Sequence, residues 1–199
     1  MIDFHRQNSN LHIILDCDDV LLDWLGAFRR FVSAIESRPI EGLPDSWDMS
    51  GWLGLTPAAS REMVVGFNHS SQFEYLEACP LAVENVSALK EMGHRLTVLT
   101  SCSDNPLIVA RRKINLECVF GDIFEQVICL PLGESKKKWL GILERGIWIE
   151  DNYDHAISGH DSGHKSFMVR RSHNRSRETP GDPLVTWVDD LRPIISLLS

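Results

Sequence analysis

Four sets of polar residues in this chain have the types and the spacing that phosphate chemistry needs. Each set follows a short apolar run or begins a predicted helix, and together they supply carboxylates, hydroxyls and amines. Carboxylates gathered at one point raise one another's pKa, and a hard divalent cation such as Mg2+ relieves that repulsion. The sets are Asp16 with Asp18, Thr100 with Ser101, the lysine run 136–138, and Glu150 with Asp151.

The first set has the spacing of a nucleophile and a proton donor. Asp16 and Asp18 lie two positions apart directly after an apolar run, so at a strand end their side chains can point the same way. One carboxylate can attack phosphorus, and the other can protonate the leaving oxygen and later activate water. A hydroxyl and a lysine on the far side would hold the remaining phosphate oxygens.

The elements around these sets alternate between strand and helix. This alternation predicts an α/β fold, a Rossmann-like parallel sheet with helices on both faces. Ligands bind at the carboxyl ends of the strands in such a sheet, so the four sets should converge at one edge. The predicted strands are 11–15, 95–100, 126–130, 147–149, 167–170 and 184–187, and the predicted helices are 20–35, 57–67, 80–92, 106–115, 135–145 and 188–198.

Residues 37–73 interrupt the alternation of strands and helices. The stretch is rich in Gly, Pro, Ser and Trp, and only its end shows helical character. We therefore predict a core domain made of residues 1–36 and 74–199, with a small helical cap at 37–73 inserted after the first strand–helix unit. Trp47, Trp52 and Phe67 could stack on a nucleobase or form the small core of the cap, and the burial habit of such residues favours the core.

Composition excludes several classes of function. The 199 residues carry 20 basic and 28 acidic side chains, a net charge of −8, which disfavours binding to a nucleic-acid polymer. No apolar run reaches the roughly 18 residues of a membrane span, and we expect neither a secretory signal nor a membrane partner. The five cysteines form no CxxC motif, which favours reduced thiols and a cytoplasmic location. The sequence leaves open a monomer or a homodimer.

The order of these motifs resembles the haloacid dehalogenase superfamily of phosphohydrolases. The resemblance is carried by ILDCDDV at 14–20, LTVLTS at 96–101, SKKKW at 135–139 and WIEDN at 148–152. Within the superfamily the chain is most similar to the 5'(3')-deoxyribonucleotidase family. Residues 73–92 and 120–130, with SHNRS and VTWVDDLRPII near the C-terminus, carry that closer likeness.

The resemblance implies a role for each site residue. Asp16 would form a phosphoaspartate, and Asp18 would be the general acid and base. Mg2+ would be held by Asp16, Asp18 and Asp151, with Glu150 acting through water. The phosphate of a small ester, a (deoxy)nucleoside monophosphate, would be held by Thr100 or Ser101 and by Lys136, with Lys137 as the alternative lysine.

The sequence also leaves two alternatives open, one for the substrate and one for the class of protein. Asp19 stands where animal members of the family have Gly, the acidic pair is followed by Asn152 rather than Arg, and the cap matches poorly. A sugar phosphate or another small phosphometabolite is therefore the rival substrate, and a binding protein without turnover is the rival class. The basic segment 165–178 either rings the site or is a solvated loop, with the loop favoured.

Overall fold

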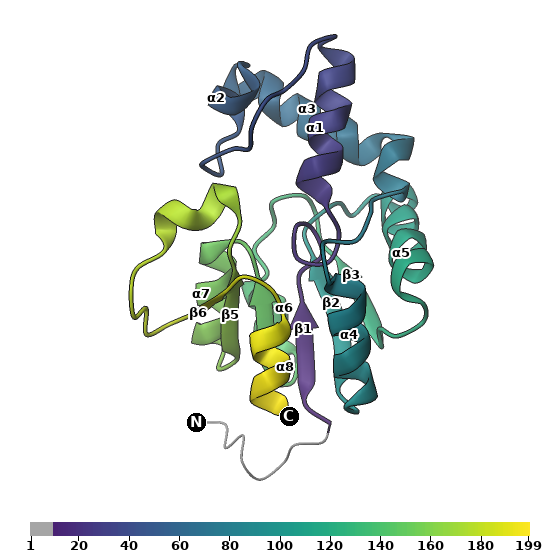
Figure 1. Cartoon of the computed structure of the whole chain (residues 1–199). Helices are drawn as coiled ribbons and strands as arrows, with labels where there is room; N and C mark the ends of the chain where they lie inside the picture. The colour runs from purple at the N-terminus through teal and green to yellow at the C-terminus, as the bar shows by residue number, and fades with distance from the viewer. Residues whose placement is uncertain (1–9) are drawn as a thin grey trace.

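The computed structural model describes residues 10–199 and contains a six-stranded parallel sheet in the order β3-β2-β1-β4-β5-β6 (Figure 1). This confirms the predicted fold class, including all six strands. The strands are β1 His12–Leu15, β2 Arg95–Thr100, β3 Gln126–Cys129, β4 Ile147–Glu150, β5 Lys165–Val169 and β6 Thr186–Val188.

Alternating side chains of the central strands pack into two hydrophobic cores, one on each face of the sheet. Ile13 and Leu15 of β1 belong to the larger cluster, together with apolar residues of α4, α5 and α8. Ile14 belongs to a second cluster with Leu140 of α6 and Trp148 of β4. Because successive side chains of a strand point to opposite faces, β1 needs helices on both sides. In Figure 1, α4 and α8 lie in front of β1, and α6 and α7 lie behind the sheet.

The register brings the ends of the three central strands to within two residues of one another. Leu15 pairs with Val98 of β2 and with Ile149 of β4. The residues that follow these positions therefore emerge at the same edge. This is the edge at which the sequence places three of its four polar sets.

The helices differ from the predicted ones mainly at their ends. They are α1 Trp24–Ile35, α2 Ser50–Leu53, α3 Pro57–His69, α4 Ala82–Glu91, α5 Pro106–Phe120, α6 Lys137–Ile142, α7 Tyr153–Asp161 and α8 Arg192–Leu198, with 3-10 turns η1 Ser71–Glu74 and η2 Ser172–Arg177. The first helix begins at Trp24 rather than at residue 20, because Asp19 has a left-handed backbone (φ 58°) and the side chain of Asp23 caps Gly26 N–H. Helix α5 runs five residues beyond its predicted end, whereas α6 and α8 are shorter than predicted.

Helix α7 was missed by the sequence prediction. The helix buries only Ala156 and Gly159, so it has no apolar stripe to reveal its period. Its start is nevertheless marked, because the Asn152 side chain accepts hydrogen bonds from the N–H groups of Asp154 and His155. Helix α7 packs against β4 and β5 directly after the acidic pair.

Segment 37–73 holds α2, α3 and most of η1, and it lies beside α1 above the carboxyl edge of the sheet (Figure 1). An aromatic cluster joins α1 to α3, with Trp24 and Phe28 stacked at 4.6 Å and Phe67 against both rings. Phe73 extends the cluster at the end of the segment. The division into core and cap stays a prediction. Within residues 10–199, no helix is both long and apolar enough to cross a membrane.

Candidate active site

A cavity of about 690 Å³ lies between the carboxyl edge of the sheet and segment 37–73. Apolar side chains from α1, α3 and the loop around Trp47 form its upper wall. All seven residues predicted for catalysis, phosphate binding and metal binding line this one cavity. They are Asp16, Asp18, Thr100, Ser101, Lys136, Glu150 and Asp151.

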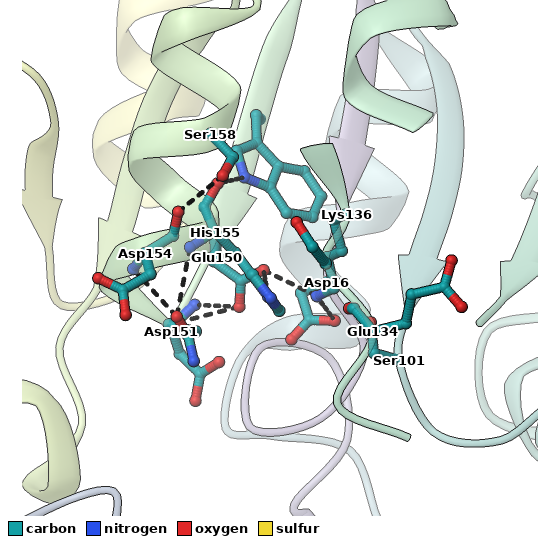
Figure 2. Close-up of polar contacts among 12 residues, drawn as sticks. Asp16, Ser101, Glu134, Lys136, Glu150, Asp151, Asp154, His155 and Ser158 are labelled. Carbon is teal, nitrogen blue, oxygen red and sulfur yellow. Dashed lines mark hydrogen bonds and ion pairs between the residues drawn. The ribbon is translucent and has the colours of Figure 1, made fainter. Parts of the chain in front are cut away.

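Lys136 lies at the centre of the acidic residues. Its Nζ is 2.6 Å from Asp16 Oδ1 and 2.7 Å from Glu150 Oε2, and the lysine is almost fully buried (Figure 2). The indole ring of Trp148 lies 5.1 Å from the same ammonium group. Lys137, the alternative lysine of the sequence analysis, is exposed. The structure therefore brings Lys136, and not Lys137, to the acidic residues.

The charges of this group are distributed unevenly. Burial, and next the Glu150 carboxylate, raise the pKa of Asp16 well above its ordinary value, against the opposing Lys136 charge. Burial and Glu150 raise the pKa of Asp151 in the same way. Burial also opposes ionisation of Glu150, but Lys136 and His155 outweigh it and hold the pKa of Glu150 below its usual range. Glu150 is thus the carboxylate that balances Lys136.

Glu150 is saturated by donors from the protein. Its Oε1 accepts the N–H groups of Asp151 and Asn152 at 3.0 Å each, and its Oε2 faces Lys136 and His155. A carboxylate that is held on both oxygens has little freedom left to bind a cation directly. That Glu150 acts on a metal through water stays a prediction.

The acidic residues fit a hard divalent cation. Carboxylate oxygens of Asp16, Glu150 and Asp151 lie within 4.8 Å of one another, and all three residues are buried. Mg2+ prefers such oxygen ligands and needs only one or two protein carboxylates beside its waters. Burial is the main cause of the raised pKa values of Asp16 and Asp151, and repulsion from neighbouring carboxylates adds to it. A cation bound among these carboxylates would relieve that repulsion.

Asp18 also lines the cavity and is paired with Arg112, an arginine that none of the sequence motifs contains. Arg112 Nη2 of α5 donates to Asp18 Oδ1 at 2.6 Å, and the Arg112 side chain is fully buried. Burial raises the pKa of Asp18, although the guanidinium lowers it. No local signal marks Arg112, because it lies 94 positions from Asp18 in a helix whose pattern reads as ordinary packing.

The two hydroxyl residues end β2 and the loop after it. Thr100 is buried at the strand end, where its backbone pairs with Cys129 of β3. Ser101 Oγ donates to the carbonyl of Glu134 at 2.9 Å, which ties this loop to the turn that precedes Lys136 (Figure 2). Both residues line the cavity, so either one stays a candidate for phosphate binding.

Two histidines reach the acidic pair. His173 Nε2 lies 2.8 Å from Asp151 Oδ2, and burial lowers the pKa of His173. His155 Nδ1 lies 3.5 Å from Glu150 Oε2. His173, Asp151 and Asp19 form a second buried group with ligand atoms within 4.8 Å of one another. Sequence spacing could not reveal this group, because η2 and the loop after β1 meet only through the fold.

The basic segment 165–178 is mostly paired within itself and with nearby acids. Arg170 binds Glu178 and Asp189, and Arg177 binds Asp154. Arg171 Nε donates to the carbonyl of Asp19, which fixes the loop after β1. The contacts of this segment thus stabilise the loop after β1 and pair Arg170 and Arg177 with nearby carboxylates.

The three aromatic residues predicted for the cap occupy different environments. Phe67 is fully buried in the aromatic cluster, and the Trp52 indole donates to the Glu41 carbonyl away from the cavity. Trp47 is 55% exposed, lines the cavity and packs edge-on against His173 at 4.9 Å. Trp47 is therefore the one of the three that a ligand in the cavity could touch.

No protein-family model matches the chain. A curated relative from Chlorobaculum tepidum, named "Putative 5'(3')-deoxyribonucleotidase", is 30% identical over 96 residues, which cover 46% of this chain and 47% of the relative. The match thus spans about half the length of that relative.

Solved structures match over nearly the whole chain. A haloacid dehalogenase-like hydrolase from Streptococcus pneumoniae, SP0104, gives a TM-score of 0.64 at 12% identity and covers 96% of this chain and 99% of its own. The "putative HAD-hydrolase YfnB from Bacillus subtilis bound to magnesium" gives 0.63 at 11% identity, with 96% and 99% covered. The chain therefore has the haloacid dehalogenase-like fold, and the resemblance stated from its motifs is confirmed at that level.

Proposed function

We propose that this protein is a magnesium-dependent phosphomonoesterase that forms a phosphoaspartate on Asp16. One observation carries the proposal. The Asp16 carboxylate lines the cavity, 2.6 Å from the Lys136 ammonium, in a group of buried carboxylates that fits a divalent cation. The motif order, the haloacid dehalogenase-like fold and the match to a magnesium-bound hydrolase support the same reading.

In the first half of the reaction, a carboxylate oxygen of Asp16 attacks phosphorus and the bond to the leaving oxygen breaks. Asp18 gives its proton to that oxygen, so the product leaves as an alcohol. Lys136 stabilises the negative charge on the phosphoryl oxygens from its position beside Asp16. A hydroxyl group of Thr100 or Ser101 holds another of these oxygens.

In the second half, the Asp18 carboxylate takes a proton from a water molecule. The water oxygen attacks phosphorus, the bond to Asp16 breaks, and inorganic phosphate is released. Asp18 thus regains the proton that the next cycle needs, and Asp16 returns as a carboxylate.

Mg2+, held by Asp16, Asp151 and the carbonyl of Asp18, would supply charge neutralisation between the nucleophile and the phosphate. Glu150, whose oxygens accept hydrogen bonds from Lys136, Asp151 and Asn152, would act on the cation through water and not as a direct ligand.

The proposed substrate is a (deoxy)nucleoside monophosphate. The cavity has about 690 Å³ of space, within the range of sites that bind small ligands, and the exposed ring of Trp47 could stack on a base. The partial match to a protein named as a deoxyribonucleotidase supports this choice. A sugar phosphate or another phosphometabolite uses the same chemistry and is the rival substrate.

Phosphate release from a panel of nucleoside monophosphates and sugar phosphates, with Mg2+ and with EDTA, tests the proposal. We expect magnesium-dependent release that is fastest with nucleotides and absent in Asp16→Asn. Activity confined to sugar phosphates would refute the nucleotide assignment. Failure to release phosphate from any ester would favour the binding protein without turnover.

A further inference from the structure

Arg112 of α5 is buried directly behind Asp18. The guanidinium is fully buried, its Nη2 lies 2.6 Å from Asp18 Oδ1, and its Nη1 lies 3.3 Å from Cys17 Sγ. The Phe73 ring covers the guanidinium plane at 4.1 Å. Among the residues that the structure describes, Asp18 is the carboxylate in ion-pair contact with Arg112.

This pairing restricts the rotation of the Asp18 side chain. A buried guanidinium that loses its carboxylate partner is a strongly destabilised charge, so rotation of Asp18 away from Arg112 is costly. The Asp18 side chain is nevertheless 25% exposed and lines the cavity. One oxygen is thus held from behind while the carboxyl group stays open to a ligand.

Helix α5 also binds the return segment, residues 69–76, where the chain re-enters the core after segment 37–73. Arg111 Nη1 donates to the carbonyls of His69 and Ser70, and the Asn115 side chain bonds to both backbone groups of Leu76. Arg112 therefore sits between the return segment, through Phe73, and the loop that carries Asp18.

We propose that Arg112 is a positioning residue that fixes the Asp18 carboxyl group for proton transfer to the leaving oxygen. This inference rests on the proposed function, in which Asp18 is the general acid. Arg112 acts through Asp18 and has no contact of its own with the cavity in the structure. A fixed donor lowers the cost of aligning the proton with the leaving oxygen in the transition state.

The experiment compares two leaving groups in the full-length protein with Mg2+. An alkyl phosphate, here a nucleoside monophosphate, needs a proton on its leaving oxygen, whereas p-nitrophenyl phosphate does not. The ratio kcat/KM reports steps up to loss of the leaving group, so it isolates this proton transfer from the later hydrolysis. The variants are Arg112→Met and Arg112→Lys, with Arg111→Met as the matched control on the same helix.

For Arg112→Met we expect kcat/KM on the alkyl phosphate to fall about 10-fold or more, as partial loss of general acid catalysis implies. On p-nitrophenyl phosphate it should stay within about threefold, and inhibition by inorganic phosphate should be unchanged, because the nucleophile and phosphate contacts remain. Arg112→Lys should recover part of the alkyl rate. Arg111→Met should affect both substrates alike.

Equal losses on both substrates in Arg112→Met, or the same selective loss in Arg111→Met, would overturn the positioning role. In either case the proposed function would still hold if the wild type is active and Asp18→Asn is inactive. Wild-type protein that is inactive on both esters would overturn both. Thermal unfolding of each variant separates a folding defect from a loss of alignment, and Arg112→Lys provides the test if Arg112→Met does not fold.

Discussion

Replacing Lys136 by Met should strongly destabilise the metal-free protein. The ammonium group lies within 2.7 Å of Glu150 and 2.6 Å of Asp16, and both carboxylates are buried. Methionine has nearly the same length, so the substitution removes the charge with little change in packing. The charge of Glu150 would then lose its buried cation while Asp16 and Asp151 remain beside it.

The size of the effect follows from the burial of the pair. Removing one partner of a buried ion pair costs about 3–5 kcal/mol, because the remaining charge stays away from water. At the lower limit of about 3 kcal/mol, a domain of this size should lose about 6–12 °C in Tm. Lys137→Met at the neighbouring exposed position should change the free energy of unfolding by less than about 0.5 kcal/mol.

Urea unfolding at pH 7 in EDTA measures both variants against the wild type. The comparison uses the midpoint and requires the slope of the transition to be unchanged, so that the difference reports native-state stability. If Lys136→Met loses no more stability than Lys137→Met, Lys136 does not balance a buried negative charge and the electrostatic reasoning about the site is wrong.

Three further predictions concern the same cavity. Burial and Asp151 raise the pKa of Asp19 to about 8, so in EDTA its contribution to stability should be present near pH 4 and fall as the pH rises towards 8. Asp19→Asn should therefore be more stable than the wild type at pH 8 by more than about 1 kcal/mol. If the free energy of unfolding, measured in urea, falls between pH 4 and pH 8 as much in Asp19→Asn as in the wild type, this prediction is wrong. Mg2+ at 100 times its Kd should stabilise the wild type by about 2.7 kcal/mol in thermal unfolding, and Asp151→Asn should lose most of that gain. Trp47→Ala should raise KM for nucleotides more than for p-nitrophenyl phosphate, and an equal change on both would remove Trp47 from base binding.

The sequence could predict the sheet and the chemistry at its edge because both depend on local pattern. Apolar runs ending in polar residues place Asp16, Thr100 and Glu150 at strand ends. A parallel sheet then brings strand ends together whatever the details of the helices. All seven predicted residues line one cavity for this reason.

What the sequence could not predict depends on contacts between distant segments. The selection of Lys136 over Lys137 depends on where a six-residue helix begins, because Lys136 is its N-cap residue and Lys137 its first residue. A run of three lysines does not reveal that boundary. Arg112 and His173 reach the site from α5 and η2, where local patterns indicate only packing and a charged loop. Helix α7 escaped prediction because its buried side is made of small residues.

Mass spectrometry of the Asp16 peptide tests the central claim most directly. The full-length protein with Mg2+ is mixed with excess nucleoside monophosphate, quenched in acid within the first turnovers and digested. The proposed reaction predicts one phosphoryl group on the peptide that contains Asp16, and none in Asp16→Asn or without substrate. Steady release of phosphate with no phosphoryl group on that peptide at any quench time would contradict a phosphoaspartate on Asp16.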